Sequence, residues 1–113
     1  MQTRVALTGD IMIARGIDQI QRASCDPELR EPAVRDARDY IALAEEAGTR
    51  IPRDVTPDYV WGESLATLRE FDPHATVLNV ETSVTTSDDF DPAKGIHYRT
   101  HSNNAAILQQ APR

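Results

Sequence analysis

The sequence predicts an α/β fold built around two principal parallel strands. Two apolar stretches, residues 5–8 and 75–81, are typical of buried strands. Two segments with helical spacing of their apolar residues, 33–47 and 61–71, lie between them. A strand, helices and a second strand form a right-handed crossover that places the two strands side by side and parallel. Because two strands alone do not make a stable open sheet, we expect the chain to be an incomplete portion of a larger domain.

The first helical segment has the clearest pattern in the chain. Its charged side chains largely occupy the face opposite the apolar stripe, so we interpret them as solvated surface. Pro32 suits the first turn of this helix, and Gly48 is a suitable end for it. The apolar stripe consists of Ala33, Ala37, Tyr40, Ile41 and Ala44.

The second helical segment aligns Trp61, Leu65 and Leu68 on one face. It ends before Pro73, because the position before a proline disfavours helix. The remaining segments have weaker patterns. Two short helices are predicted at residues 17–22 and 103–110. Residues 82–92 are predicted as a long polar loop, and residues 94–99 as a segment that folds back over the strand ends.

Composition limits the classes of function. The 113 residues suit a single domain, residues 1–113, with a thin core. The formal net charge of -6 would repel a phosphate backbone, which argues against nucleic-acid partners. The single cysteine, Cys25, allows no internal disulfide, and we interpret it as an incidental small residue. No apolar run approaches the roughly 20 residues of a membrane span. As written, the sequence predicts a cytoplasmic protein, or an envelope-associated one if an export signal was removed or missed.

Oxygen-bearing side chains follow both predicted strands. Asp10 comes directly after Gly9 at the end of the first strand, and Asn79 and Glu81 lie at the end of the second. The carboxyl ends of parallel strands meet at one edge of a sheet, and residues two apart on a strand point to the same side. Carboxylate and amide oxygens suit a divalent cation, which we expect to be manganese, iron or zinc. Two such ions would polarise a phosphoryl oxygen and generate a hydroxide nucleophile.

Simpler roles remain open for these residues. Asp10 is equally suited to cap a following helix, while Asn79 and Glu81 are suited to hydrogen bonds in a turn. The available imidazoles lack the paired helical spacing of a metal motif, so a complete two-metal site would need ligands from elsewhere. These imidazoles are His74, His97 and His101.

Other catalytic motifs are missing from the sequence. Neither strand is followed by the glycine-rich phosphate loop of a dinucleotide or Walker-type site, and the chain has no nucleophile elbow. An aspartyl-phosphate enzyme of the haloacid dehalogenase type would need a second aspartate two residues after Asp10, where this sequence has Met12. Metal-assisted hydrolysis is therefore the favoured chemistry.

Three ordered motifs accompany the predicted strands. They are Gly9-Asp10-Ile11-Met12 with Arg15, Asn79-Val80-Glu81-Thr82, and Lys94-Gly95-Ile96-His97-Tyr98-Arg99. Together they resemble the capsule-synthesis protein CapA family, also called the poly-γ-glutamate biosynthesis family. Segments 35–40 and 59–62 also look like members of this group. Val80 replaces a more usual leucine and leaves both polar positions of its motif intact.

The resemblance implies a layered fold similar to the calcineurin-like metallophosphoesterases, of which this chain is the amino-terminal part. It implies metal ligation by Asp10 and a metal-binding or catalytic role for Asn79 and Glu81, while residues 94–99 shape the site. We therefore expect a metal-dependent hydrolase-like domain in capsule or poly-γ-glutamate biosynthesis. Its expected partners are an anionic polymer or phosphorylated substrate and polymer-synthesis proteins. The alternatives are a non-catalytic component that binds the anionic polymer or its synthase, and an inactive fragment.

Overall fold

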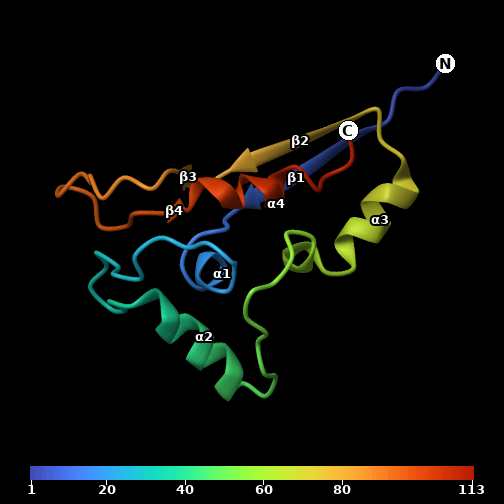
Figure 1. The fold of residues 1–113 in the computed structure, drawn as a ribbon. Helices are drawn as coiled ribbons and strands as arrows, with labels where there is room; N and C mark the ends of the chain where they lie inside the picture. The colour runs from blue at the N-terminus through green and yellow to red at the C-terminus, as the bar shows by residue number, and fades with distance from the viewer.

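The protein is described here by a computed structural model that covers residues 1–113. Its principal sheet consists of two parallel strands, β1 (Val5–Ile11) and β2 (Ala75–Val80), which lie side by side in Figure 1. The pairing begins with Val5 opposite Ala75 and ends with Ile11 opposite Val80. The predicted α/β arrangement, with two parallel strands as neighbours, is confirmed.

The helices between the two strands confirm both predicted helical segments, although each begins later than expected. Asp36 has an extended backbone, and its side chain accepts a hydrogen bond from the Arg38 amide, so α2 begins after Asp36. Gly62 has a φ of 54°, a left-handed conformation that separates a 3-10 turn from α3. No helix has both the length and the apolar character needed to cross a membrane. The elements are α1 (Gly16–Gln19), α2 (Ala37–Glu46), η1 (Tyr59–Trp61) and α3 (Ser64–Phe71).

The chain after β2 forms a second, smaller parallel pair, β3 (Ser83–Val84) and β4 (Arg99–Thr100). The sequence predicted only a loop and a returning segment here, because a two-residue strand has no alternating pattern to detect. Figure 1 shows the loop between β3 and β4 extending away from the principal sheet. The chain then continues through η2 (Ser102–Asn104) and α4 (Ala105–Leu108), within the predicted helical region.

The core is thin, as the composition predicts, with 16 of 113 residues buried. One apolar cluster consists of Ile20, Ile41 and Val55, with the partly buried Ile51 packed against it. A hydrogen bond of 3.1 Å from the Val55 amide to the Ile20 carbonyl joins the connector after α2 to the end of α1. This cluster fixes α2 against the segment that follows β1.

Candidate metal site and the contacts around it

The two principal strands bring Asp10 and Asn79 together at their carboxyl ends. The two residues are register partners, and Asn79 Nδ2 donates a hydrogen bond of 2.5 Å to Asp10 Oδ1. The register advances three residues on β1, from Leu7 to Asp10, but two on β2, from Val77 to Asn79, which is a β-bulge in β1. An extra residue moves the following side chain to the other face of a strand. The bulge therefore turns Asp10 toward Asn79.

Glu81 lies one residue beyond β2 and is exposed. Its amide donates a hydrogen bond of 3.0 Å to the Ile11 carbonyl, which continues the pairing of the two strands by one step. The hydrogen bond of Asp10 goes to Asn79 and not to Glu81. The structure thus brings two of the three predicted ligands into contact and leaves the third two residues beyond Asn79, outside this hydrogen bond.

The Asp10–Asn79 pair offers donors that fit a divalent cation, namely a carboxylate and an amide oxygen. The Asp10 carboxylate accepts a hydrogen bond through one oxygen, which leaves acceptor capacity on both oxygens. Rotation of the Asn79 amide would turn its oxygen, in place of its nitrogen, toward a bound cation. No three His, Cys, Asp or Glu side chains converge in a group that could hold a metal ion. The pair by itself is therefore not a complete set of metal ligands.

The three histidines contact backbone groups. His74 Nδ1 accepts a hydrogen bond of 3.0 Å from the Arg4 amide, beside the start of β1. His101 Nδ1 likewise accepts a backbone amide, at 3.1 Å. His97 Nε2 lies 2.8 Å from the Asp91 carbonyl oxygen. None of these contacts joins an imidazole to the Asp10–Asn79 pair.

A second polar centre forms around Asp18, which is 1% exposed. Asp18 Oδ2 accepts a hydrogen bond of 2.7 Å from the Cys25 amide. Asp18 Oδ1 accepts three more, at 2.7 to 2.8 Å, from the Thr100 hydroxyl, the His101 amide and the Asn104 side-chain amide. We call Asp18 and these four donors the Asp18 centre. It joins α1 to β4 and η2, and so fixes the position of the chain that follows residues 94–99.

Arg15, from the first motif, makes a two-pronged ion pair with Glu31. The hydrogen bonds measure 2.9 and 2.8 Å, and the two side chains are 18% and 6% exposed. The guanidinium carbon also lies 4.9 Å from the ring centroid of Tyr40 and 4.8 Å from that of Tyr98. Burial lowers the pKa of Arg15, but the hydrogen bond and charge of Glu31 outweigh it, so this pKa is raised and the side chain stays charged.

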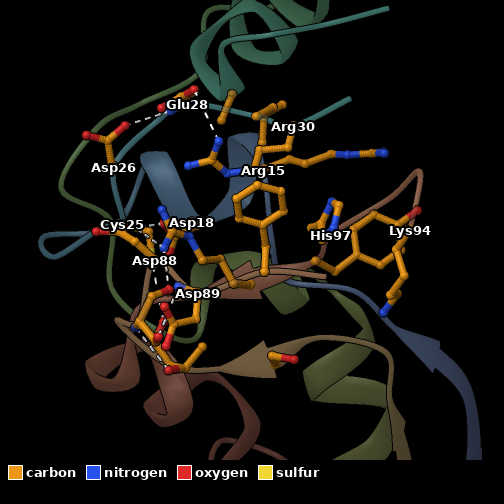
Figure 2. A pocket seen from close by; sticks show the side chains of 18 of the residues that line it. Arg15, Asp18, Cys25, Asp26, Glu28, Arg30, Asp88, Asp89, Lys94 and His97 are labelled. Carbon is orange, nitrogen blue, oxygen red and sulfur yellow. Dashed lines mark hydrogen bonds and ion pairs between the residues drawn. The ribbon is translucent and has the colours of Figure 1, made fainter. Parts of the chain in front are cut away.

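A polar cavity of about 400 Å³ lies between the segment 25–30 and the segment 83–99. Residues of the third motif line it together with Arg15 and Asp18, whereas Asp10, Asn79 and Glu81 do not. The third motif therefore lies beside Arg15 and lines a cavity that the Asp10–Asn79 pair does not line. Acidic and basic side chains are mixed around the cavity (Figure 2), and two of its carboxylates, Glu28 and Asp88, pair with the lining residues Arg30 and Arg99.

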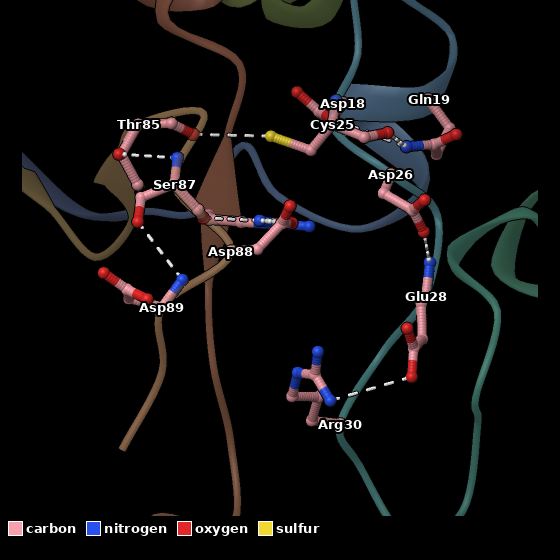
Figure 3. Close-up of polar contacts among 11 residues, drawn as sticks. Asp18, Gln19, Cys25, Asp26, Glu28, Arg30, Thr85, Ser87, Asp88 and Asp89 are labelled. Atoms are coloured by element: carbon pink, nitrogen blue, oxygen red, sulfur yellow. Dashed lines mark hydrogen bonds and ion pairs between the residues drawn. The ribbon is translucent and has the colours of Figure 1, made fainter. Parts of the chain in front are cut away.

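Cys25 lies at the edge of this cavity, and its thiol donates a hydrogen bond of 3.4 Å to the Thr85 carbonyl (Figure 3). Burial raises the pKa of the Cys25 thiol, and the nearby charge of Asp18 raises this pKa further. A raised pKa lowers the fraction of reactive thiolate at neutral pH. This environment supports the interpretation of Cys25 as an unreactive residue.

Sequence patterns did not single out Asp18 or Glu31. Asp18 stands in a short helix of mixed polarity, and Glu31 precedes Pro32 in a segment that has the composition of a surface loop. The side-chain partners of Asp18 lie 82 and 86 positions later, so no local spacing records their contact. Arg15 was visible only as part of the first motif. The burial of these three side chains is a tertiary property.

The sequence has known relatives. Residues 4–112 match the family described as bacterial capsule synthesis protein PGA_cap. Proteins from two strains of Mycobacterium tuberculosis, both named probable polyglutamine synthesis accessory protein, are 40% identical to the chain over 104 residues. The match covers 92% of this chain but 27% of each relative. No solved structure matches, so the calcineurin-like fold stays a prediction. The chain belongs to the PGA_cap family of bacterial capsule synthesis proteins.

Proposed function

We propose that the chain supplies part of the divalent-metal site of a hydrolase-like domain in the synthesis or processing of capsular polymer or poly-γ-glutamate. The observation that carries this proposal is the contact between Asp10 and Asn79 at the ends of two parallel strands. Ligands of open α/β sheets bind at the carboxyl ends of the strands, where this pair lies. The family, and the relatives' name with its reference to polyglutamine synthesis, support the biological context.

Each predicted residue has a defined role in this proposal. Asp10 binds the cation through its carboxylate, Asn79 adds its amide oxygen or orients the substrate, and Glu81 contributes a second carboxylate. Manganese, iron or zinc, when bound, supplies a Lewis acid and lowers the pKa of a water molecule. The cation also attracts an anionic polymer or a phosphorylated substrate, which the formal net charge of -6 would otherwise repel. Further ligands come from the part of the family's domain outside the matched region.

A second candidate is a non-catalytic role, in which the domain binds the anionic polymer or the proteins that make it. The name of the mycobacterial relatives, which describes an accessory protein, favours this role. In it the chain holds polymer or its synthase without cleaving a bond. The two candidates differ in whether metal binding is accompanied by hydrolysis.

Titration calorimetry with Mn²⁺ tests the metal site. The protein to use is the chain joined to the remaining region of its family's domain, as the wild type, as Asp10→Asn and as the control Asp89→Asn, which changes an exposed aspartate outside the pair. Because Asp10→Asn removes a charged ligand, we expect Mn²⁺ binding to weaken by about tenfold or more. The control variant keeps the wild-type affinity. Equal affinities of the wild type and Asp10→Asn would contradict the proposal.

A hydrolysis assay then separates the two candidate roles. The Mn²⁺-loaded protein is incubated with poly-γ-glutamate and, separately, with a chromogenic phosphoester. Release of shorter polymer or of the chromophore, lost in Asp10→Asn, supports the hydrolase. Mn²⁺ binding without product release from either compound favours the accessory role.

A further inference from the structure

Asp10 lines a cavity between β1 and the elements η1, α3 and α4. The cavity has a volume of about 600 Å³, which is within the range of small-molecule sites, and it shares no lining residue with the polar cavity. Most of the residues that line it are apolar, and two of them, Ile13 and Ile107, are 2% and 1% exposed. Asp10 is the only charged residue in the lining. We call this space the apolar cavity.

The side-chain donors of the apolar cavity already have backbone acceptors. The indole N–H of Trp61 donates a hydrogen bond of 2.8 Å to the Ile107 carbonyl. The hydroxyls of Ser64 and Thr67 donate to carbonyls three and four residues earlier in the chain, at 2.5 and 3.5 Å. The Thr8 hydroxyl donates to a carbonyl of β2, at 3.3 Å. No side-chain N–H or O–H of the lining is therefore left over for a polar ligand.

This lining selects between ligand chemistries. A carboxylate inside the apolar cavity would lose its hydration and find no donor in exchange, which is costly. Poly-γ-glutamate carries a carboxylate in each residue, so it is a poor occupant of this space. A hydrocarbon group needs no donor, and each methylene that leaves water improves affinity by about fourfold. The apolar cavity is therefore complementary to a ligand whose charge is confined to the end beside Asp10.

The apolar lining continues beyond this cavity. A neighbouring cavity of about 590 Å³ shares the lining residues Met12, Ile17, Val60 and Trp61. Its other residues are also mostly hydrophobic, and they extend as far as Ile51 without including Asp10. A hydrocarbon group that is longer than the first cavity therefore meets further apolar surface as it leads away from Asp10.

We propose that the apolar cavity binds the hydrocarbon group of the substrate, and that the substrate is an amphipathic phosphoester. This inference rests on the proposed function, because the cation at Asp10 binds the phosphate while the hydrocarbon group lies in the cavity beside it. The two parts of the ligand match the two parts of the site in charge and in polarity. The inference narrows the substrate class of the site from any phosphorylated compound or anionic polymer to phosphoesters of long apolar alcohols.

Binding of alkylphosphonates tests the apolar cavity. Ethyl-, butyl- and octylphosphonate share one anionic head and differ in hydrocarbon length, and their carbon–phosphorus bond is not an ester bond. Calorimetry is performed with and without Mn²⁺ on the same longer protein that is used for the Mn²⁺ titration. We expect the dissociation constant to fall by at least about tenfold from ethylphosphonate to octylphosphonate. Equal dissociation constants for the three compounds would overturn the proposal.

Two variants of α3 locate the bound hydrocarbon group. Thr67→Phe enlarges an exposed side chain that lines the apolar cavity, and Ala66→Phe is the matched control, because Ala66 is exposed on the same helix and does not line it. We expect Thr67→Phe to bind octylphosphonate no more tightly than ethylphosphonate, whereas the control keeps the wild-type difference. An unchanged preference for octylphosphonate in Thr67→Phe would show that the hydrocarbon group binds elsewhere, and would also overturn the proposal.

The metal site and the apolar cavity can fail separately in this design. If the wild type binds Mn²⁺ but shows no dependence on hydrocarbon length, the inference about the cavity fails and the metal site at Asp10 stands. If the wild type binds no Mn²⁺, the proposed function fails, and the alkylphosphonate series without Mn²⁺ decides about the cavity. A length dependence that Thr67→Phe abolishes then supports the apolar cavity, and its absence overturns it.

Discussion

Asp18 and Asp10 make the same kind of contact in opposite surroundings. Each accepts a hydrogen bond from an asparagine side-chain amide, at 2.8 Å from Asn104 and at 2.5 Å from Asn79. Asp18 is 1% exposed and has three further donors within 2.8 Å. Asp10 is exposed, and its carboxylate has Asn79 as its partner. The first carboxylate is saturated by the protein, and the second has acceptor capacity left for a ligand.

Burial and the number of donors separate a carboxylate that holds the fold together from one that is available to a ligand. A buried carboxylate surrounded by donors holds segments together, since removing it leaves those donors without partners. An exposed carboxylate at a strand end contributes little to folding and is free to bind a cation. The two residues lie only eight positions apart, Asp10 near the end of β1 and Asp18 in α1, so the residue type does not distinguish them.

The largest expected effect comes from removing the buried acid. Asp18→Ala leaves its four donors without their acceptor, and each buried unsatisfied group costs roughly 1–3 kcal/mol, so the free energy of unfolding should fall by at least about 3 kcal/mol. Asp10→Ala should change it by less than about 0.5 kcal/mol. Urea denaturation of both variants measures the two effects. Similar losses of stability in the two variants would show that Asp18 and Asp10 do not differ in this way.

The second effect extends the comparison to another buried carboxylate. Glu31→Ala leaves the Arg15 guanidinium unpaired between two tyrosines. Breaking a fully buried pair costs about 3–5 kcal/mol, and the 18% exposure of Arg15 reduces the expected loss to about 2 kcal/mol. Glu28→Ala is the control, since its pair with Arg30 spans 3.7 Å on the surface. A thermal melt that shows equal losses for both variants would argue against this account of Glu31.

A smaller effect concerns pH and the start of α2. Hydrogen bonds from Arg38 lower the pKa of Asp36 from 3.8 to about 2. The folded-state pKa is depressed, so the stability that Asp36 adds is complete above pH 3.8 and is lost as the pH falls through about 2. An NMR titration of the Asp36 carboxyl should therefore show a midpoint near 2. A midpoint near the ordinary aspartate value would show that the Arg38 contact does not persist in solution.

The smallest effect is expected at an exposed ion pair. Arg4 and Asp72 lie 2.7 Å apart, with side chains 42% and 83% exposed. Asp72→Asn should change the free energy of unfolding by about 0.5 kcal/mol or less, because solvent screens such pairs. Asparagine also tolerates the left-handed φ of 49° at this position. Denaturation at low and at high salt should show the same small difference in the free energy of unfolding between Asp72→Asn and the wild type, or none. A loss as large as that of Glu31→Ala would contradict this prediction.

The sequence predicted the parts of the fold that depend on local patterns. Apolar runs located β1 and β2, and the helical spacing of apolar residues located α2 and α3. Both patterns depend only on residues that are close together in the sequence. The contact between Asp10 and Asn79 followed from the parallel crossover. The β-bulge that turns Asp10 toward Asn79 was not predicted, because the local sequence of each strand does not reveal the register between the two strands.

The Asp18 centre could not be predicted for a different reason. Its donors come from the loop after α1 and from β4, η2 and the residue between them, and three of the four are backbone or side-chain amides whose position depends on the whole fold. The exposure of Leu7 and Val77 was equally hidden, because an apolar strand residue predicts burial whichever layer supplies it.

The long span of the Asp18 centre has a consequence for synthesis of the protein. Asp18 meets Thr100, His101 and Asn104, which lie 82 to 86 positions later in the chain, so the full set of contacts can form only after residue 104 has left the ribosome. Contacts between such distant residues also form slowly, because a long loop must be ordered first. Until then α1 carries a solvated carboxylate, and the contacts that join β4 and η2 to α1 are missing.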